Sequence, residues 1–131
     1  MHITGVYAAL LGFLFVALSV RTLLLRRELR IAVGDAGNPK MLRAMRVHSN
    51  FAEYIPFGLF LVYLSETQGA ERLLVHALCL ALLAGRVSHS YGVSQLNEDY
   101  RFRVAGMALT FTPIIVASIY LLFAFAKHSL I

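Results

Sequence analysis

The chain has 131 residues, of which 59% are hydrophobic and only 15% are charged. A soluble domain usually carries about 25% charged and about 45–50% apolar residues, and a domain of this size cannot bury the excess apolar surface. The composition therefore excludes an ordinary water-soluble domain. The net charge of +5 does not indicate a nucleic-acid-binding protein, because seven of the twelve Lys and Arg residues lie within residues 21–46, directly after an uncharged stretch over residues 1–20.

Two long apolar segments predict membrane-spanning helices near the two ends of the chain, over residues 3–25 and 102–127. The first contains one charged residue, Arg21, close to its end, and the stretch from residue 104 to residue 126 contains none. About 20 apolar residues suffice to cross about 30 Å of hydrocarbon. Both segments are therefore long enough to span a bilayer.

Two further segments, over residues 40–64 and 72–92, are less apolar but complete a helical hairpin. The link between them contains Gly69, which is typical of a turn. The polar ends of both helices must then face protein or the membrane interface. We therefore predict an all-α membrane protein, a single domain over residues 1–131 with four transmembrane helices in an up-down bundle.

The distribution of basic residues predicts the orientation, since Lys and Arg are retained on the cytoplasmic side of a membrane. The connections at residues 21–46 and 86–103 contain ten of them, whereas the hairpin turn contains only Arg72 and the C-terminal segment only Lys127. We therefore expect both termini to be extracytoplasmic and the two basic connections to be cytoplasmic.

Polar residues that interrupt the apolar segments are the candidate functional residues. A charged group inside a membrane costs about 2.5–3.5 kcal/mol, so it must face protein or water. At 100° per residue, Arg46, Asn50 and Glu53 share one face of the second predicted helix. The helices therefore converge on one polar site near the cytoplasmic end, to which the third and fourth contribute Arg86, His89, Arg101 and Arg103.

The charge balance of this site favours a small zwitterion with excess negative charge, because several Arg residues face a single carboxylate, Glu53. Arg matches carboxylates bidentately, and Glu matches an ammonium group. The alternative is that Arg46 pairs with Glu53 and Arg86 with His89, so that these charges only satisfy one another. His48 points to the opposite face of its helix and is expected to have a structural or interface role.

The single cysteine, Cys79, excludes a disulfide or a cysteine-based metal site within one chain. It lies in an apolar run, which is typical of a small residue that fills a helix interface. We predict no metal site.

The segment RVHSNFAEYIP at residues 46–56 resembles the second-helix motif of the MAPEG family, the membrane-associated proteins in eicosanoid and glutathione metabolism. The spacing Asn-x-x-Glu-Tyr-x-Pro carries the resemblance, and RRELR at residues 26–30 and GRVSH at residues 85–89 support it. With four predicted spans, the resemblance covers nearly the whole chain. The bacterial branch of small inner-membrane proteins looks most similar, judged by GDAG at residues 34–37 and RVAGM at residues 103–107.

This resemblance implies a homotrimer in the bacterial inner membrane, with glutathione as a cosubstrate held between neighbouring subunits near the cytoplasmic side. It places Asn50, Glu53 and Tyr54 against the tripeptide. It also implies that Arg26 or Arg27 of the adjacent subunit reaches the same ligand. It also implies that His89 contributes to the pocket, and we add Arg46 and Arg86, from the polar helix faces above, as further candidate glutathione-binding residues.

The resemblance further implies thiol chemistry, with Arg103 as the candidate catalytic residue and Arg101 as its rival. A thiol with a pKa of about 8.5 is mostly protonated at neutral pH, and an adjacent guanidinium stabilises the thiolate. The expected function is that of a glutathione-dependent transferase or peroxidase acting on lipophilic electrophiles from the bilayer. The alternatives are a non-catalytic membrane trimer that binds a lipid or another anion, and a small proton-coupled exporter.

Overall fold

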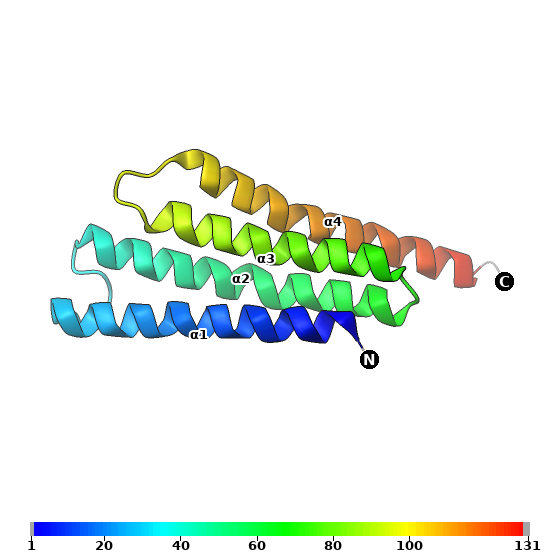
Figure 1. Cartoon of the computed structure of the whole chain (residues 1–131), viewed down its shortest axis with the longest axis horizontal. Coiled ribbons are helices and arrows are strands. Elements are labelled where there is room, and N and C mark those ends of the chain that lie inside the picture. The colour runs from blue at the N-terminus through cyan, green and yellow to red at the C-terminus, as the bar shows by residue number, and fades with distance from the viewer. Residues whose placement is uncertain (1, 130–131) are drawn as a thin grey trace.

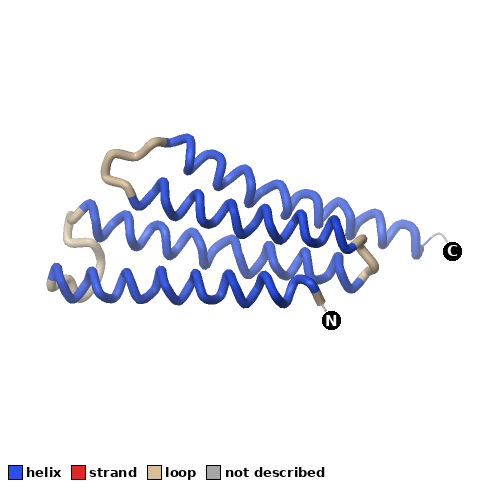
Figure 2. The backbone as a smooth tube through the Cα atoms, in the orientation of Figure 1, coloured by secondary structure: helices blue, strands red, loops and turns tan. Residues whose placement is uncertain are grey.

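The chain folds as an antiparallel bundle of helices joined by short connections (Figures 1 and 2). The computed structural model describes residues 2–129, with side chains for residues 2–127. Over this range the chain forms four helices and no strand, as predicted. The helices are α1 (Ile3–Leu29), α2 (Pro39–Thr67), α3 (Arg72–Ser94) and α4 (Tyr100–Ser129).

Three of these helices, α1, α3 and α4, are long and apolar enough to cross a membrane within the described part of the chain. The second helix, α2, carries more charged residues but has 29 residues and runs alongside the others for most of the bundle (Figure 1). At 1.5 Å per residue its length is about 44 Å, which exceeds the hydrocarbon thickness of about 30 Å. All four helices therefore have the length that a membrane-spanning bundle requires.

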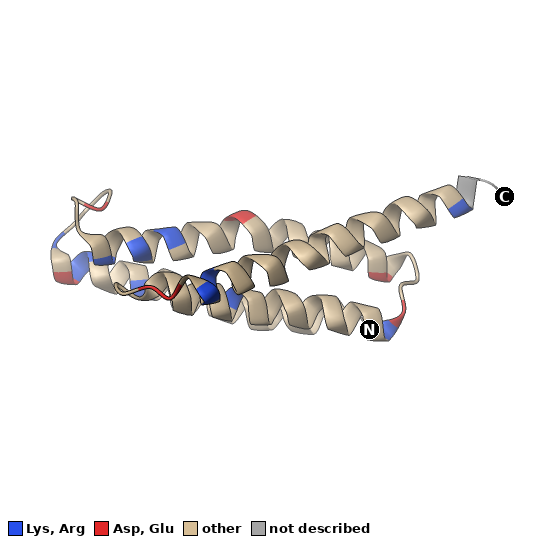
Figure 3. Ribbon diagram, turned by 90° about the horizontal axis from the view of Figure 1, so that it is seen from above, with Lys and Arg blue, Asp and Glu red and all other residues tan. Residues whose placement is uncertain are grey.

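The two ends of the bundle differ in charge. Both termini and the α2–α3 turn lie at one end, and the α1–α2 and α3–α4 connections lie at the other (Figure 1). Most Lys and Arg residues gather at the end with the two connections (Figure 3). Arg72, the first residue of α3, and Lys127, near the end of α4, lie at the end with the termini. The fold thus separates the basic residues along the long axis of the bundle, with most of them at the end that holds the α1–α2 and α3–α4 connections.

Helix α1 is longer than predicted, because it continues past residue 25 to Leu29. Arg30 then adopts a left-handed conformation with φ of 56°, and the N–H of Ile31 donates to the carbonyl of Arg26 at 3.0 Å. Arg, Glu and Leu are good helix formers, and cations stabilise the C-terminal end of a helix dipole. Arg26 and Arg27 therefore belong to the last turn of α1 rather than to the connection that follows it.

The start of α2 is fixed by its own sequence. The Asn38 side chain accepts hydrogen bonds from the backbone N–H groups of Lys40 at 3.0 Å and Met41 at 3.2 Å. Pro39 follows as the first helical residue, where its missing N–H costs nothing. This cap fixes the residue at which α2 begins.

Glu66, in the last turn of α2, caps α1 at the end of the bundle that contains the termini. Its carboxylate accepts hydrogen bonds from the backbone N–H of Ile3 at 2.5 Å, the N–H of Thr4 at 3.1 Å and the Thr4 hydroxyl at 2.7 Å. A carboxylate at this position also complements the positive end of the helix dipole. The sequence offered no signal for this contact between residues more than sixty positions apart.

The core lies along the inner faces of the bundle, with α2 and α3 between α1 and α4 (Figure 1). Cys79 is fully buried, which confirms its predicted place as a small filler of a helix interface. Buried hydrophobic residues of all four helices form this core, including Leu11, Leu18, Val47, Phe51, Ile55, Val62, Val75, Leu78, Leu82 and Ala117.

The close approach of α3 and α4 depends on Gly85 and Gly106. A Cβ added at Gly106 would lie 2.6 Å from the backbone nitrogen of His89 and 2.7 Å from the carbonyl oxygen of Gly85. These are backbone atoms, so a side chain at this position can be accommodated only if the two helices move apart. Small residues that let helix backbones approach are typical of membrane interfaces.

Replacing Gly106 with Ala is therefore expected to lower the free energy of unfolding of the purified protein by about 1–3 kcal/mol, the usual cost of overpacking. The melting temperature should fall accordingly. The matched control is Gly12→Ala, because a Cβ on Gly12 meets no atom within 4 Å. Alanine there should be neutral or stabilise α1 by about 0.5–1 kcal/mol through its higher helix propensity. Equal melting temperatures for the two variants would contradict this account of the α3–α4 interface.

Candidate functional site

The predicted convergence of three helices is centred on Arg86 of α3, which is fully buried. Its Nη1 donates to Oδ1 of Asn50 on α2 at 2.6 Å. Its Nη2 donates to Oγ1 of Thr110 on α4 at 2.5 Å and to the carbonyl of Gly106 at 3.4 Å. One guanidinium therefore links α2, α3 and α4 by hydrogen bonds.

The Arg86 cation is neutralised by no carboxylate among the described side chains. Besides its neutral hydrogen-bond acceptors, it faces the ring of Tyr54, whose centroid lies 5.9 Å from the guanidinium carbon. Its Nε has no hydrogen-bond partner within residues 2–127. Burying a charge without an opposite charge is costly, so an anion close to the Arg86 guanidinium would be stabilised by it.

Asn50 lies between the buried Arg86 guanidinium and the surface of the subunit. The Asn50 side chain is half-buried, and its oxygen is engaged by Arg86. No hydrogen-bond acceptor among the described residues takes a proton from its Nδ2. An amide group carries two N–H donors, so Asn50 keeps donors that a ligand or another subunit could engage.

Arg46 and Glu53 flank Asn50 along α2, and both are exposed on the isolated subunit. We call the side of α2 that carries these two residues its open face. Neither makes an ion pair with any described side chain; the ion pairs of that part of the chain involve Glu66 and Glu98. The interpretation in which Arg46 pairs with Glu53 is therefore not supported within one subunit. Arg86, in turn, donates to Asn50 and Thr110 rather than to His89.

Glu98, in the α3–α4 connection, organises the adjacent end of the site and is a residue that the sequence analysis missed. Its carboxylate is 3% exposed and lies 2.9 Å from Nη1 of Arg43 and 3.7 Å from Nη1 of Arg103. Arg43 also donates to the carbonyl of Val93 at 3.0 Å. This cluster connects Arg103, the predicted catalytic residue, to α2. Two consecutive acidic residues, Glu98 and Asp99, just before the basic start of α4 were the signal that could have identified it.

The structure distinguishes Arg103 from its rival Arg101. Arg103 is part of the Glu98 cluster, with its side chain about half exposed. Arg101 is exposed, and its backbone N–H donates to the Asp99 side chain at the start of α4. Of these two guanidinium groups, only that of Arg103 contacts a carboxylate in the described structure, so its position is the better defined of the two.

His89 lies on the same side of α3 as Arg86, one turn further along, and is buried. Its backbone borders Gly106 of α4, so it belongs to the tight α3–α4 interface. Within the described residues, no group of three or more His, Cys, Asp or Glu side chains is placed to hold a metal ion.

Arg26 and Arg27 are not brought to the Arg86 cluster within one subunit. Helix α1 packs against α2 and α3 and makes no contact with α4 over the described residues. Arg26 instead donates to the carbonyl of Gly34 at 2.9 Å and holds the α1–α2 connection, while Arg27 is exposed. A role of either residue at this site therefore requires a second subunit.

His48 has the structural role that its position predicts. Its Nε2 lies 2.9 Å from the hydroxyl of Ser19 on α1. Its ring stacks on Phe15, with 4.9 Å between the ring centroids. His48 therefore packs α2 against α1, on the face of α2 opposite to Arg46 and Glu53.

Comparison with known proteins agrees with this architecture. The MAPEG family model matches residues 4–123. The chain is similar to the inner membrane protein YecN of Escherichia coli, in strain K12 and in the O6:H1 strain CFT073 alike, with 35% identity over 114 residues. The match covers 87% of this chain and 86% of the relative. The chain therefore belongs to the MAPEG family and is an integral membrane protein.

Proposed function

We propose that this protein binds glutathione at the site formed by α2, α3 and α4, and uses it as a transferase or peroxidase acting on lipophilic electrophiles. The observation that carries the proposal is that Arg46 and Glu53, on either side of Asn50, are both exposed and form no ion pair within the described residues. Glutathione carries carboxylates, which Arg46 can bind as a fork, and an α-ammonium group, which Glu53 can bind. Asn50 supplies a donor between them.

Buried charge supports the same ligand class. The Arg86 cation lies behind Asn50 without a carboxylate partner in the described structure, so the site has an excess of positive potential. A ligand with net negative charge is attracted by that potential, whereas Glu53 attracts only its ammonium group. The donor set therefore fits a peptide that has more carboxylates than ammonium groups.

The proposed assembly is a homotrimer in which a neighbouring subunit covers the open face of α2. Exposed charges within a membrane-spanning helix are costly when they face lipid. A neighbouring α1 would cover Arg46 and Glu53 and bring Arg26 or Arg27 toward the ligand. Both of these residues lie in the last turn of α1, at the end of the bundle with the two basic connections, and α1 makes no contact with α4 of its own subunit over the described residues.

The proposed chemistry rests on Arg103. A guanidinium next to the glutathione sulfur stabilises the thiolate, which is the nucleophile, relative to the thiol. Glu98 positions this guanidinium at the start of α4 through its contacts with Arg43 and Arg103. The lipophilic electrophile reaches the sulfur from the bilayer between subunits, the new bond forms between sulfur and carbon, and the leaving group departs with its electron pair.

Calorimetric titration of the detergent-purified protein with glutathione tests the binding, and a conjugation assay with an aryl halide tests the chemistry. S-methylglutathione is the matched ligand, because it keeps the charges and removes the thiol. We expect both ligands to bind and only glutathione to be conjugated. Binding without conjugation would support the non-catalytic alternative, and absence of binding would refute the proposal. Native mass spectrometry in mild detergent should give a trimer, which a stable monomer would contradict.

We further propose that the protein lies in the bacterial inner membrane with both termini extracytoplasmic. Cysteine introduced in place of Val33, which is 89% exposed in the α1–α2 connection, should resist a membrane-impermeant maleimide in intact cells and react after lysis. Cysteine in place of the exposed Gln68, in the α2–α3 turn, should react in both cases. The native Cys79 is buried and gives little background. The reverse labelling pattern would show the opposite orientation.

A further inference from the structure

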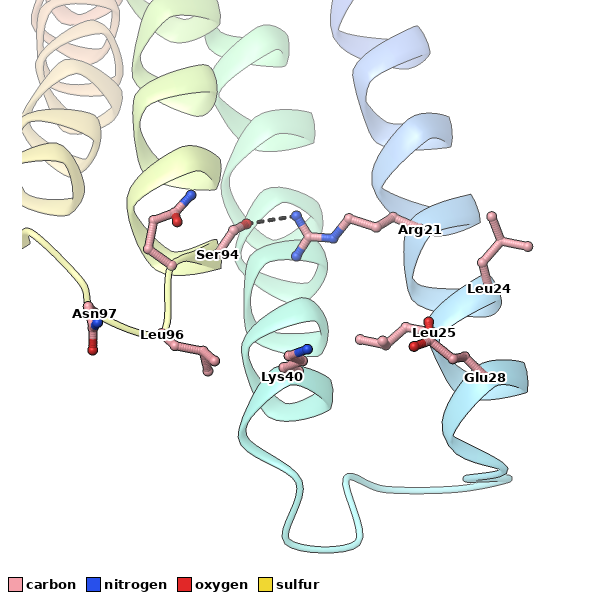
Figure 4. A pocket seen from close by; sticks show the side chains of 9 residues that line it. Arg21, Leu24, Leu25, Glu28, Lys40, Ser94, Leu96 and Asn97 are labelled. Atoms are coloured by element: carbon pink, nitrogen blue, oxygen red, sulfur yellow. Dashed lines mark hydrogen bonds between the residues drawn. The ribbon is translucent and has the colours of Figure 1, made fainter.

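We propose a second binding site, separate from the Arg86 site, that takes the phosphate-bearing headgroup of an anionic phospholipid. A cavity of about 620 Å³ lies between α1, the beginning of α2 and the end of α3 with its following connection (Figure 4). The Arg86 site is formed by α2, α3 and α4, whereas this cavity is lined by residues of α1 and by none of α4, and the two sites share no residue. The proposal stands independently of the glutathione site.

Arg21 is the main cation of this cavity. It interrupts an apolar run of α1 and reaches toward α3, where its Nη1 donates to the hydroxyl of Ser94 at 2.7 Å (Figure 4). The Ser94 hydroxyl donates in turn to the carbonyl of Ser90. Because a hydroxyl is neutral, this contact does not neutralise the Arg21 charge. A guanidinium has five N–H donors, and no carboxylate among residues 2–127 pairs with this one. Its remaining donors are available to an anion.

Lys40 adds a second cation to the same cavity from the first turn of α2 (Figure 4). Its ammonium group has no ion-pair partner within the described part of the chain. The cavity also contains one carboxylate, Glu28, which lies two turns after Arg21 along α1. Two cations against one anion leave a net positive lining, which selects a negatively charged ligand.

The depth and the apolar wall of the cavity favour a lipid over a soluble anion. Arg21 lies eight residues before the end of α1, which is about 12 Å at 1.5 Å per residue, and a long cationic side chain at that depth extends toward the headgroup region. Leu24, which is 57% exposed, and Leu25 line the same cavity. A phosphodiester can therefore contact Arg21 and Lys40 while its acyl chains lie along the leucines.

Native mass spectrometry of the full-length protein in mild detergent tests the site, with phosphatidylglycerol, phosphatidylcholine and inorganic phosphate as separate probes. We expect retention of phosphatidylglycerol over phosphatidylcholine, and no displacement by inorganic phosphate at the same ionic strength. Each cation near a membrane surface contributes about fivefold in affinity, so Arg21→Gln and Lys40→Gln should each lower retention about fivefold. Glu28→Gln should raise it by a similar factor.

The matched control is Arg101→Gln, which removes an exposed cation from the same end of the bundle but outside the cavity. It should leave phosphatidylglycerol retention unchanged. Equal losses for Arg21→Gln and Arg101→Gln would overturn the proposal, because they would show a general charge effect. Equal retention of both lipids, or displacement by inorganic phosphate, would overturn it as well. If Arg21→Gln does not fold, Glu28→Gln still decides, since unchanged retention in that variant contradicts the site.

Discussion

Replacing Glu53 with Gln is expected to weaken glutathione binding about tenfold to a hundredfold, while the proposed trimeric assembly and the melting temperature stay unchanged. Glu53 is exposed on the open face of α2 and makes no ion pair within the described residues, so its charge is not needed to hold the subunit together. Gln keeps the size and the hydrogen-bonding capacity but removes the charge that meets the α-ammonium group. Titration calorimetry gives the affinity, and thermal denaturation gives the stability.

A ligand analogue makes this test specific. Glutathione without its α-amino group should bind the unaltered protein about as weakly as glutathione binds Glu53→Gln. The analogue should then lose no further affinity in the variant, because the interaction is already absent. Glu71→Gln is the matched control, since Glu71 is exposed at the opposite end of the bundle and makes no side-chain cap at the start of α3. Loss of the trimer with unchanged affinity would instead make Glu53 a structural residue.

The arrangement of the helices could be predicted because it depends on patterns within short segments. Apolar length predicted α1 and α4, and the turn residues around Gly69 predicted the hairpin. The helical period placed Arg46, Asn50 and Glu53 on one face, and the structure confirms that Asn50 lies toward Arg86 while His48 lies toward α1. These features need no knowledge of how distant segments meet.

The partners of individual side chains could not be predicted in the same way. Glu66 caps α1 from the last turn of α2, and Glu98 holds Arg43 across the α3–α4 connection. Both contacts join residues that are 55 or more positions apart, so they follow from the packing of complete helices and not from local periodicity. The sequence likewise indicated that Arg86 belongs to the site, but not that its guanidinium is fully buried behind Asn50.

The polar residues of α2 explain why this helix is the least apolar of the bundle. The other three helices qualify as membrane spans by composition, whereas α2 does not. Arg46 and Glu53 lower its hydropathy, and they are the same residues that form the open face of the proposed site. The departure of α2 from a simple membrane helix therefore coincides with the proposed site, as expected for charged residues within a membrane domain.

Replacing Asn50 with Asp is expected to raise stability and lower glutathione affinity, two effects of opposite sign. The new carboxylate would occupy the position of the amide oxygen, 2.6 Å from Nη1 of Arg86. Their attraction, reduced by the cost of burying the carboxylate, should stabilise the fold by about 1–2 kcal/mol and raise the melting temperature by several degrees. The variant also loses the Nδ2 donor and places a negative charge beside the ligand, so affinity should fall at least about tenfold.

Asn97→Asp is the matched control, because Asn97 is exposed in the α3–α4 connection at the same end of the bundle. It adds the same charge without approaching Arg86, so the melting temperature and glutathione affinity should both stay near those of the unaltered protein. A lower melting temperature for Asn50→Asp would show that the Arg86 cation already has a carboxylate partner in the assembled protein, supplied by the neighbouring subunit. Unchanged affinity would show that Asn50 only supports Arg86, and the ligand would then have to be bound through Arg46 and Glu53 alone.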